Sequence, residues 1–588
     1  MLRRPRTGTV VWAVVALLVS VASLVERSRI PVFVYGSSED DRLYLSHALS
    51  LMHRHWLGPF GRLTLAKGAS YPVFIAAMHK LRLPLPLGEQ LTYLLAAAAV
   101  AACLLLLTRS VAVAGAAYVL LAMDPVNFGV VDSLVFRDGW YSSLTVLFLA
   151  STFLAVQGAT TCRSRRSWLW IAPAGVVAGV SGAAFWLCRE EGPWLLPALL
   201  VVVVGPPAVE LGRGVFRRAG RRPRPRRVLL RAARVLVAAG LVAVCAAVPI
   251  VEVARTNLHY YGVGLTNDLT TGQFARAFAD WTTVEAGPSR PGIPISVSQR
   301  AAVYAVSPAA KVLEPSLENP KNAWLAVTCR VLHICDDLPG AVSVWAFRDA
   351  ATSAGFFDSG AASQTFFATL DQQIETACDS GALRCTRRLP VSVQSLQHFR
   401  LGPFLTSVRG SVAEVMASRY LGPALPPPRT VLPAVHVLYD ATIIGMPRTA
   451  AAVAAQRVTY TRGAGQLRLL ASVYRVLVPV LAVLGLLGLL WSLVRPRRSD
   501  LGLVVLTVGF FTAVVSRLAF VGLLDTTQFG TGGDARYQLP THATLLVAGV
   551  TGTVLLVARI RSVRPPRPAA PGGPDDQPVD HGQMAPVS

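Results

Sequence analysis

Apolar runs long enough to cross a hydrocarbon core of about 30 Å as helices recur along this chain, separated by short polar segments. The first run is long for the core of a signal peptide and lacks a small-x-small cleavage site, so we interpret it as a membrane anchor. The pattern predicts an all-α polytopic membrane protein with about ten transmembrane helices, at residues 9–25, 89–107, 110–126, 140–157, 168–187, 192–208, 229–250, 472–494, 501–523 and 541–558.

Arginine blocks fall in alternate connections of this pattern, which predicts the orientation. The positive-inside rule assigns such blocks to the cytoplasmic side. With ten spans, every block then lies on one side, and the N- and C-termini are both cytoplasmic. The blocks comprise Arg3, Arg4 and Arg6, then Arg163, Arg165 and Arg166, the stretch 213–234, then Arg495, Arg497 and Arg498, and finally Arg559, Arg561, Arg564 and Arg567.

The net charge of +24 would indicate nucleic-acid binding in a soluble protein. Here the arginines lie in the short connections and are explained by membrane orientation, so we expect no nucleic-acid partner. Lysine occurs at only four positions, which we interpret as the compositional bias of a GC-rich bacterial genome. The expected location is therefore the plasma (inner) membrane of a bacterium, in contact with membrane lipid.

This topology predicts four parts of the chain. Residues 1–250 form a membrane module with spans one to seven and a first outer loop at 26–88. Residues 251–471 form one mostly helical extracytoplasmic domain, and residues 472–558 hold the last three spans. Residues 559–588 are rich in Pro, Gly and Asp and are expected to be a disordered cytoplasmic tail.

The first outer loop carries the pattern of two juxtamembrane helices. Ser38 and Asp41 have the spacing of a capping box, and apolar residues then recur at helical spacing to Met52. A second short helix is expected from Tyr71, after the break at Lys67-Gly68. Both helices are expected to lie on the outer membrane face.

Four of the eight cysteines lie in the large outer region as two close pairs. In an oxidising compartment this spacing favours two local disulfides, Cys329–Cys335 and Cys378–Cys385. Free thiols and a metal site stay open as alternatives, although the spacing is not Cys-x2-Cys. The second pair ends the segment 345–385, whose apolar spacing and Gly stops are helical.

Ionisable residues gather at the outer ends of the spans, where groups facing lipid would be costly and therefore indicate a polar site. Carboxylates can take a proton from an acceptor, and Lys or Arg can stabilise a phosphate leaving group. Together they predict transfer from a phosphate-linked donor, with Asp40 and Asp41 as catalytic candidates. The substrate-binding candidates are Glu39, Lys67, Arg137, Asp138, Arg189, Glu190, Arg536 and Tyr537.

Each of these groups also has a structural interpretation. Asp41 would cap the first juxtamembrane helix, Lys67 would extend its charge to water, and Arg536 would anchor a span at the interface. The pairs Arg137/Asp138 and Arg189/Glu190 would be interfacial ion pairs. We interpret His47, His53 and His55 as a solvated helix face rather than as metal ligands.

These residues resemble the multi-pass GT-C glycosyltransferases, and the chain is similar to protein O-mannosyltransferases and lipid A aminoarabinose transferases over about residues 1–200 and 500–560. In that family an acidic catalytic residue and two juxtamembrane helices follow the first span. The stretch EDDRLYLSHALSL, followed by GPFGRLTLAKGASYPVFIAAMHKL, is similar to that loop, and Arg536-Tyr537-Gln538-Leu539-Pro540 resembles an Arg-Tyr…Pro motif near a late span.

The resemblance implies that Asp40 or Asp41 is the catalytic acid, that Lys67 meets the donor phosphate and that Asp138 is a second-loop acid. Lys67 is followed by Gly-Ala-Ser, where the family commonly has Pro-Pro. The implied donor is a polyprenyl-phosphate-linked sugar. The acceptor, whether glycan, lipid or protein, stays open, as does a divalent metal ion as cofactor. The alternative functions are a non-enzymatic membrane assembly factor and a transporter or lipid flippase.

Overall fold

The computed structural model describes residues 7–30, 32–34, 39–129, 133–162, 164–216, 225–288, 290, 292–386, 399–421, 433–445, 450–497, 499–526 and 535–563. Ten helices within these ranges are long and apolar enough to cross a membrane, and each predicted run overlaps one of them. The described residues form no β-strand, only isolated bridges. An all-α, multi-pass architecture is therefore confirmed in outline.

The α-helices run in the order α1 Thr7–Arg29, α2 Asp41–Met52, α3 Ser70–Lys80, α4 Leu85–Thr108, α5 Val111–Ala122, α6 Asp138–Thr161, α7 Trp168–Trp186, α8 Leu196–Phe216, α9 Pro225–Tyr261, α10 Gly272–Thr283, α11 Val297–Val306, α12 Pro308–Lys311, α13 Glu314–Leu317, α14 Ala323–Leu332, α15 Gly340–Ser353, α16 Gly360–Asp379, α17 Leu401–Ala417, α18 Pro433–Thr442, α19 Ala450–Val494, α20 Leu501–Leu524 and α21 Leu539–Val563. Short 3-10 turns include η4 Gly192–Leu195, η6 Arg419–Leu421 and η8 Ala535–Gln538. The two expected juxtamembrane helices are α2 and α3.

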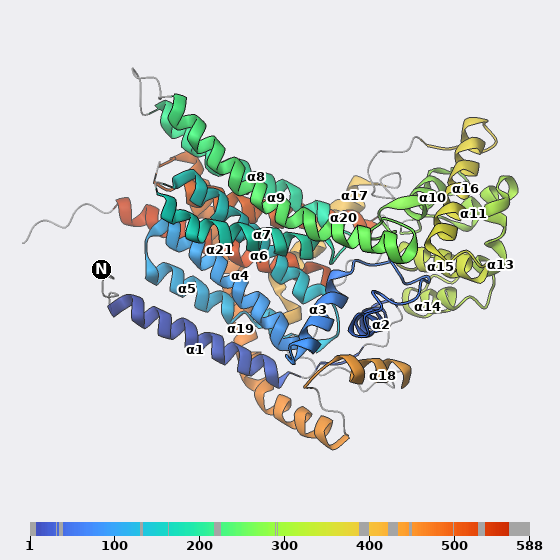
Figure 1. Ribbon diagram of the computed structural model, residues 1–588, viewed down its shortest axis with the longest axis horizontal. Coiled ribbons are helices and arrows are strands. Elements are labelled where there is room, and N and C mark those ends of the chain that lie inside the picture. Colours follow the sequence, from blue (N-terminus) through green and yellow to red (C-terminus); the bar gives the residue numbers. More distant parts are fainter. Residues whose placement is uncertain are drawn as a thin grey trace, which may run out of the picture.

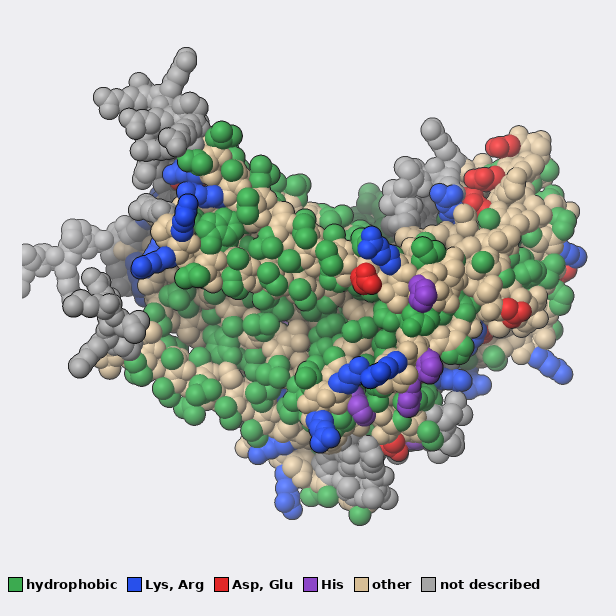
Figure 2. Space-filling model, in the orientation of Figure 1, with side chains coloured by type: hydrophobic (Ala, Val, Ile, Leu, Met, Phe, Trp, Pro, Cys, Tyr) green, Lys and Arg blue, Asp and Glu red, His purple; other side chains and the backbone are tan. Residues whose placement is uncertain are grey.

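The long helices lie side by side as a bundle, and α10 to α16 form a separate group at one end of it (Figure 1). We call this the domain end of the bundle. The bundle surface is apolar, with Leu18, Leu200, Leu236 and Val476 each more than 60% exposed. Figure 2 shows hydrophobic side chains along the flank of the bundle, with Lys and Arg side chains at the end far from α10 to α16 and also on the side of those helices. Such an exposed apolar flank is what lipid would cover.

Small residues allow α19 and α21 to pack closely. A Cβ on Gly488 would lie 2.2 Å from the carbonyl oxygen of Gly552, and a Cβ on Gly485 would lie 2.8 Å from Cα of Gly549. Helices in a membrane gain little from hydrophobic association, so close backbone approach of this kind supplies the packing that joins them. This contact places the last span against α19 and sets the position of η8, which begins it.

The helical unit, residues 262–386, has its own hydrophobic core. Trp281 is fully buried and its ring meets those of Tyr304 and Phe347 edge-on. The two disulfides, Cys329–Cys335 and Cys378–Cys385, both lie in this unit. The unit is helical, as expected, and Gly355 and Gly381 follow α15 and α16 with positive φ, where only glycine is unstrained.

The expected single domain at 251–471 has different limits in the structure. Helix α9 continues to Tyr261, and α19 already begins at Ala450. Between them, α17, η6 and α18 share the core of the bundle rather than that of the helical unit. On α18, Tyr439 donates to the carbonyl oxygen of Val32, and the His79 ring on α3 lies 3.0 Å from the carbonyl oxygen of Thr442. The first residues of the expected domain, on α9, and its last part, from α17 to α19, therefore belong to the membrane part of the protein.

Two expectations fall partly outside the described residues. The tail expected at 559–588 is described only as far as Val563, and up to that residue it is still helix α21. Ser38, which the capping-box interpretation pairs with Asp41, lies outside the described residues.

Candidate functional site

Asp40 and Asp41 have different environments at the start of α2. Asp40 is the N-cap residue, but its side chain makes no capping hydrogen bond. Its carboxylate instead accepts from Lys67 Nζ at 2.5 Å and lies 3.8 Å from an Arg536 guanidinium nitrogen. Asp41 is the first helical residue and is fully buried, and its Oδ1 accepts from the backbone N–H of Arg42. The helix thus begins at Asp41 with Asp40 as its N-cap residue, whereas the capping-box interpretation placed Asp41 three residues after the cap, at Ser38, which lies outside the described residues.

The loop that carries Lys67 is fixed by a close backbone approach. A Cβ on Gly68 would lie 1.9 Å from the carbonyl oxygen of Leu187, so this position requires glycine. The neighbouring Ser70 donates its N–H to the same oxygen and its hydroxyl to the carbonyl oxygen of Ala184. The turn after α7 thus holds the loop, which explains in physical terms why glycine follows Lys67.

Lys67 is only 8% exposed, so the interpretation that it extends its charge to water is wrong. Its ammonium group lies 5.3 Å from the Tyr44 ring centroid and 5.6 Å from that of Trp345. Burial lowers the pKa of Lys67, while the charge of Asp40 opposes this shift. Burial would raise the pKa of Asp40, but Lys67 chiefly, with Arg536 and Arg137, lowers it to about 2. Asp40 is therefore ionised at neutral pH.

Two crossed ion pairs lie close to Asp40 and Lys67. Arg137 donates to both carboxylate oxygens of Glu190, at 2.9 and 2.8 Å, and also to the carbonyl oxygen of Cys188. Arg189 in turn bonds Asp138. Each arginine of the predicted pairs thus binds the acid of the other, which ties the start of α6 to the turn between α7 and η4. Bidentate pairing of this kind fixes geometry as well as charge.

A third arginine, Arg517 on α20, joins these ion pairs. It is fully buried and donates to Glu191 at 2.5 Å and to the carbonyl oxygen of Tyr537 at 3.0 and 3.1 Å. Glu191 also accepts from Arg189 at 2.7 Å. Burial would raise the pKa of Glu191, but Arg189 and Arg517 lower it to about 2. The Tyr537 ring lies against Arg189 at 4.8 Å, next to Arg536.

We call this set the arginine layer: Arg137, Asp138, Arg189, Glu190, Glu191 and Arg517. The three arginines and Asp138 are buried, and Glu190 and Glu191 are half-buried. Their charged groups pair with one another, so they position the neighbouring loops. This is the arrangement expected for the structural interpretation of Arg137/Asp138 and Arg189/Glu190. Lys67 and Arg536 are the cations that face Asp40, and we define Asp40, Lys67 and Arg536 as the candidate site.

The helical unit reaches the candidate site through α15. Arg348 is fully buried and binds Asp268 at 2.7 Å and the carbonyl oxygens of Arg62 and Thr64. It thereby holds the loop that leads into Lys67, three residues along α15 from Trp345. The site is open to solvent at Asp40 and Arg536, whose side chains are 28% and 30% exposed.

Two remaining candidates lie beside the site rather than in it. Glu39 accepts from Arg62 at 3.3 Å, and Arg62 also binds Asp349 on α15 at 2.7 Å. His47 is 5% exposed, and burial lowers its pKa to about 4, so its assignment to a solvated face is wrong. His53 and His55 are exposed, as that interpretation expected.

Sequence reasoning missed Tyr44, Trp345 and Arg517. Arg517 had a usable signal, because a single arginine inside an apolar run indicates a buried partner. Tyr44 and Trp345 had none, since no local pattern indicates that rings 23 and 278 positions away from Lys67 lie against its ammonium group. The candidate site residues belong to no described group of His, Cys, Asp and Glu with the spacing to hold a metal ion; one such group lies on α10 and α16.

No protein-family model, curated protein or solved structure matches this chain. Its function is therefore argued from the site itself.

Proposed function

We propose that this protein is a membrane glycosyltransferase, which moves a sugar from a polyprenyl-phosphate donor to an acceptor outside the bacterial plasma membrane. The observation that supports this best is the carboxylate of Asp40 held by Lys67 at 2.5 Å and Arg536 at 3.8 Å, at the end of a bundle of apolar helices. An acid beside two cations suits the two halves of this reaction, which are proton removal and phosphate departure.

In the proposed reaction, an acceptor hydroxyl oxygen attacks the anomeric carbon of the sugar. The bond from that carbon to the phosphate oxygen breaks, and its electron pair leaves with the polyprenyl phosphate. The hydroxyl proton passes to Asp40. Lys67 and Arg536 stabilise the charge that develops on the departing phosphate. Asp41 is fully buried, so we assign the acid–base role to Asp40.

The contact between Asp40 and Lys67 describes the protein before donor binding. A pKa of about 2 makes Asp40 a weak base, because Lys67 and Arg536 stabilise its charge. A donor phosphate would compete with Asp40 for both cations. As they turn to the phosphate, the pKa of Asp40 rises, and the carboxylate becomes a better base when the substrate is bound.

Asp40→Asn and Lys67→Met test this proposal in membranes that carry each variant. The assay follows transfer from a panel of radiolabelled polyprenyl-phosphate hexoses and pentoses to lipid, glycan and protein fractions. We expect Asp40→Asn to lower the rate by about 10²–10⁴, as loss of a general base does. We expect Lys67→Met to lower it by about 10²–10³.

Asp358→Asn is the matched control, because Asp358 is exposed and forms no ion pair with a described residue. It should transfer at the parental rate. If the parent transfers sugar and all three variants insert normally and match its rate, the proposed mechanism is wrong. If the parent transfers none of the panel sugars, an assembly factor or a carrier becomes the better account.

The proposed orientation has a separate test. A reporter that is active only outside the membrane should be active when inserted near residue 300, in the helical unit. It should be silent near residue 225 or at the C-terminus. The starts of α1 and α9 lie at the end of the bundle opposite the helical unit, as the six spans between them require (Figure 1). Activity at the C-terminus would contradict the proposed side of the reaction.

A further inference from the structure

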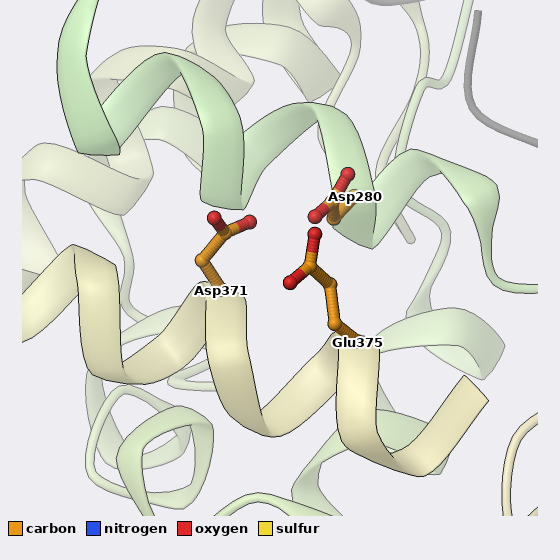
Figure 3. A group of neighbouring side chains, drawn as sticks. All are labelled: Asp280, Asp371 and Glu375. Carbon is orange, nitrogen blue, oxygen red and sulfur yellow. The ribbon is translucent and has the colours of Figure 1, made fainter. Parts of the chain in front are cut away.

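Three acidic side chains converge between α10 and α16, inside the helical unit. They are Asp280 on α10 and Asp371 and Glu375 on α16, and one carboxylate oxygen of each lies within 4.8 Å of the others. Figure 3 shows the three carboxylates pointing into the same space between the two helices. We call this group the acidic triad.

The helix geometry brings these side chains together. Asp371 and Glu375 are four residues apart, so they lie on the same face of α16, one turn from each other. That face packs against α10, where Asp280 precedes the buried Trp281. Like charges at this spacing destabilise a helix, and a third acid on the facing helix adds to the repulsion. A cation bound between the two helices would offset this repulsion.

Asp371 gives an independent indication of a ligand. Its side chain is only 7% exposed, and its Oδ1 is buried and accepts no hydrogen bond. Neither Asp371 nor Glu375 forms an ion pair with a Lys, Arg or His among the described residues. A buried carboxylate oxygen without a donor costs free energy unless a cation or a proton satisfies it.

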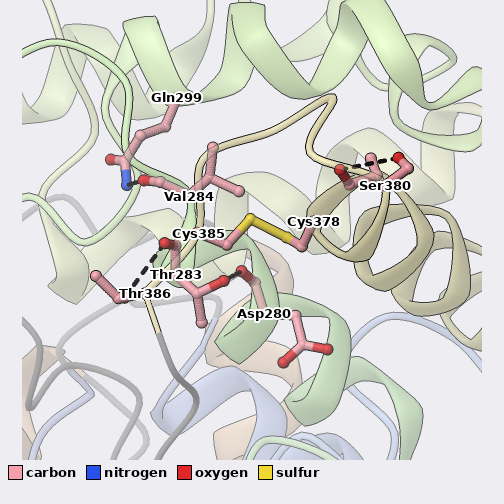
Figure 4. Close-up of a disulfide and its surroundings, with 9 residues drawn as sticks. Asp280, Thr283, Val284, Gln299, Cys378, Ser380, Cys385 and Thr386 are labelled. Carbon is pink, nitrogen blue, oxygen red and sulfur yellow. Dashed lines mark hydrogen bonds between the residues drawn. A yellow bond between two sulfur atoms is a disulfide. The ribbon is translucent and has the colours of Figure 1, made fainter.

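The second disulfide links the end of α16 to the segment that pairs with the end of α10, close to the triad. Cys378 follows Glu375 by three residues on α16, and its partner Cys385 pairs with Val284, just after α10. The chain is held there by backbone hydrogen bonds from Glu285 to Arg384 and from Thr386 to Thr283, both 2.8 Å. Figure 4 shows the disulfide next to the end of α10 that carries Asp280. Both helices that supply the acids are thus fixed at the triad.

We propose that the acidic triad binds a divalent cation, and that its preferred ion is Ca²⁺. Calcium takes oxygen ligands at about 2.3–2.6 Å, so two ligand oxygens on opposite sides of one ion are about 5 Å apart. Magnesium needs about 2.0–2.1 Å, which brings opposite oxygens to about 4.2 Å. The three ligand oxygens lie within 4.8 Å of one another, which either ion can span, but a site with three carboxylates suits calcium, because magnesium is usually held by one or two carboxylates. Three carboxylates offer up to six oxygens, and water completes the shell. This site is independent of the proposed transferase activity.

The test is a titration of the full-length protein in detergent with Ca²⁺, and with Tb³⁺ as a luminescent substitute. Trp281 adjoins Asp280 in the sequence and serves to sensitise Tb³⁺ bound at the triad. We expect saturable Tb³⁺ luminescence that Ca²⁺ displaces with a dissociation constant of about 10⁻⁴–10⁻³ M, the range of extracellular modules. Mg²⁺ should displace it at least tenfold less well.

Asp371→Asn and Glu375→Gln should each weaken Ca²⁺ binding at least tenfold. Glu375 is exposed, so its variant keeps the test valid if Asp371→Asn fails to fold. Asp379→Asn is the matched control, since it removes an exposed acid one turn further along α16. It should bind as the parent does. Parental binding by both triad variants would overturn the proposal, as would a parent with no saturable binding. Equal displacement by Mg²⁺ would overturn the preference for calcium.

Discussion

The arginine layer and the acidic triad are two clusters of acids between packed helices, and they differ in how those acids are paired. In the layer, Glu190, Asp138 and Glu191 each bind at least one arginine of the same chain. In the triad, Asp371 and Glu375 form no such pair among the described residues. The first arrangement is complete within the protein and fixes its geometry. The second is incomplete, which is why we infer a ligand for it and a positioning role for the layer.

Removal of one arginine from the layer should give the largest loss of stability. Arg517→Leu leaves Glu191 with one partner and the Tyr537 carbonyl without two donors. We expect a loss of about 3–5 kcal/mol in the free energy of unfolding, as when one partner of a buried pair is removed. Thermal unfolding in detergent measures it.

The double variant Arg517→Leu/Glu191→Gln is the control, because it removes the acid together with its partner. It should recover part of the loss. A substitution in the triad should have the opposite effect on the free energy of unfolding. Without Ca²⁺, Asp371→Asn removes repulsion between carboxylates and should not destabilise the protein. If Arg517→Leu is neutral and Asp371→Asn is costly, the contrast between the two regions is wrong.

Gly68→Ala should disturb the candidate site without changing any charge. The new Cβ would lie 1.9 Å from the Leu187 carbonyl oxygen, so the loop must move and carry Lys67 with it. A displacement of about 1 Å can cost about 10²-fold in rate. Transfer by membranes measures the effect. Gly61→Ala, where a Cβ meets no atom within 4 Å, should leave the rate unchanged. Equal rates for both variants would show that the position of Lys67 does not matter.

The sequence pattern was sufficient for the bundle because each span is a local signal of length and hydropathy. It also placed Asp40, Lys67 and Arg536 among the ten candidates, since charges at span ends are conspicuous, but it could not separate them from Asp41 or from the arginine layer. It could not reveal that Arg137 binds Glu190 rather than Asp138, because crossed pairing depends on how α6 and α7 pack. Nor could it separate α17 and α18 from the helical unit, since amphipathic spacing does not say which core a helix joins.

Asp280 shows a further limit of the pattern. The spacing of Asp371 and Glu375 was readable as one face of a helix, but an exposed acidic face is the ordinary interpretation. Only the packing of α10 on α16 brings Asp280 beside these two acids and buries Asp280 and Asp371. Sites made by contacts between distant segments are therefore absent from any local pattern.

The second disulfide should stabilise the helical unit and increase the affinity of the triad for Ca²⁺. Closure of a loop this short contributes about 2 kcal/mol in the chain-entropy description. The double variant Cys378→Ser/Cys385→Ser should therefore lower the thermal midpoint and weaken Ca²⁺ binding. The matching change at Cys329 and Cys335 should lower the midpoint but leave Ca²⁺ affinity unchanged. Thiol alkylation without reductant should label none of these four cysteines in the parent, and full labelling would rule the bridges out.

Acid should weaken the contact between Asp40 and Lys67 in a defined range of pH. The pKa of Asp40 is about 2 in the folded protein, below its ordinary value of 3.8. A lowered pKa contributes stability that is fully present above about pH 4 and is lost as the pH falls toward 2. The shift corresponds to about 2 kcal/mol, and solvent screening reduces this to about 1–2 kcal/mol because the side chain is 28% exposed.

Thermal midpoints of the parent and Asp40→Asn measure this contribution between pH 6 and pH 2.5. The parent should be more stable at pH 6, because Asn cannot carry the charge that Lys67 binds. The difference should shrink as the pH falls below about 4, where the carboxylate begins to take up a proton. The difference between the parent and Asp358→Asn serves as the control and should stay small throughout. A constant difference for Asp40→Asn over the whole range would mean that its carboxylate is not held by Lys67, and the candidate site would lose the contact on which the proposed chemistry rests.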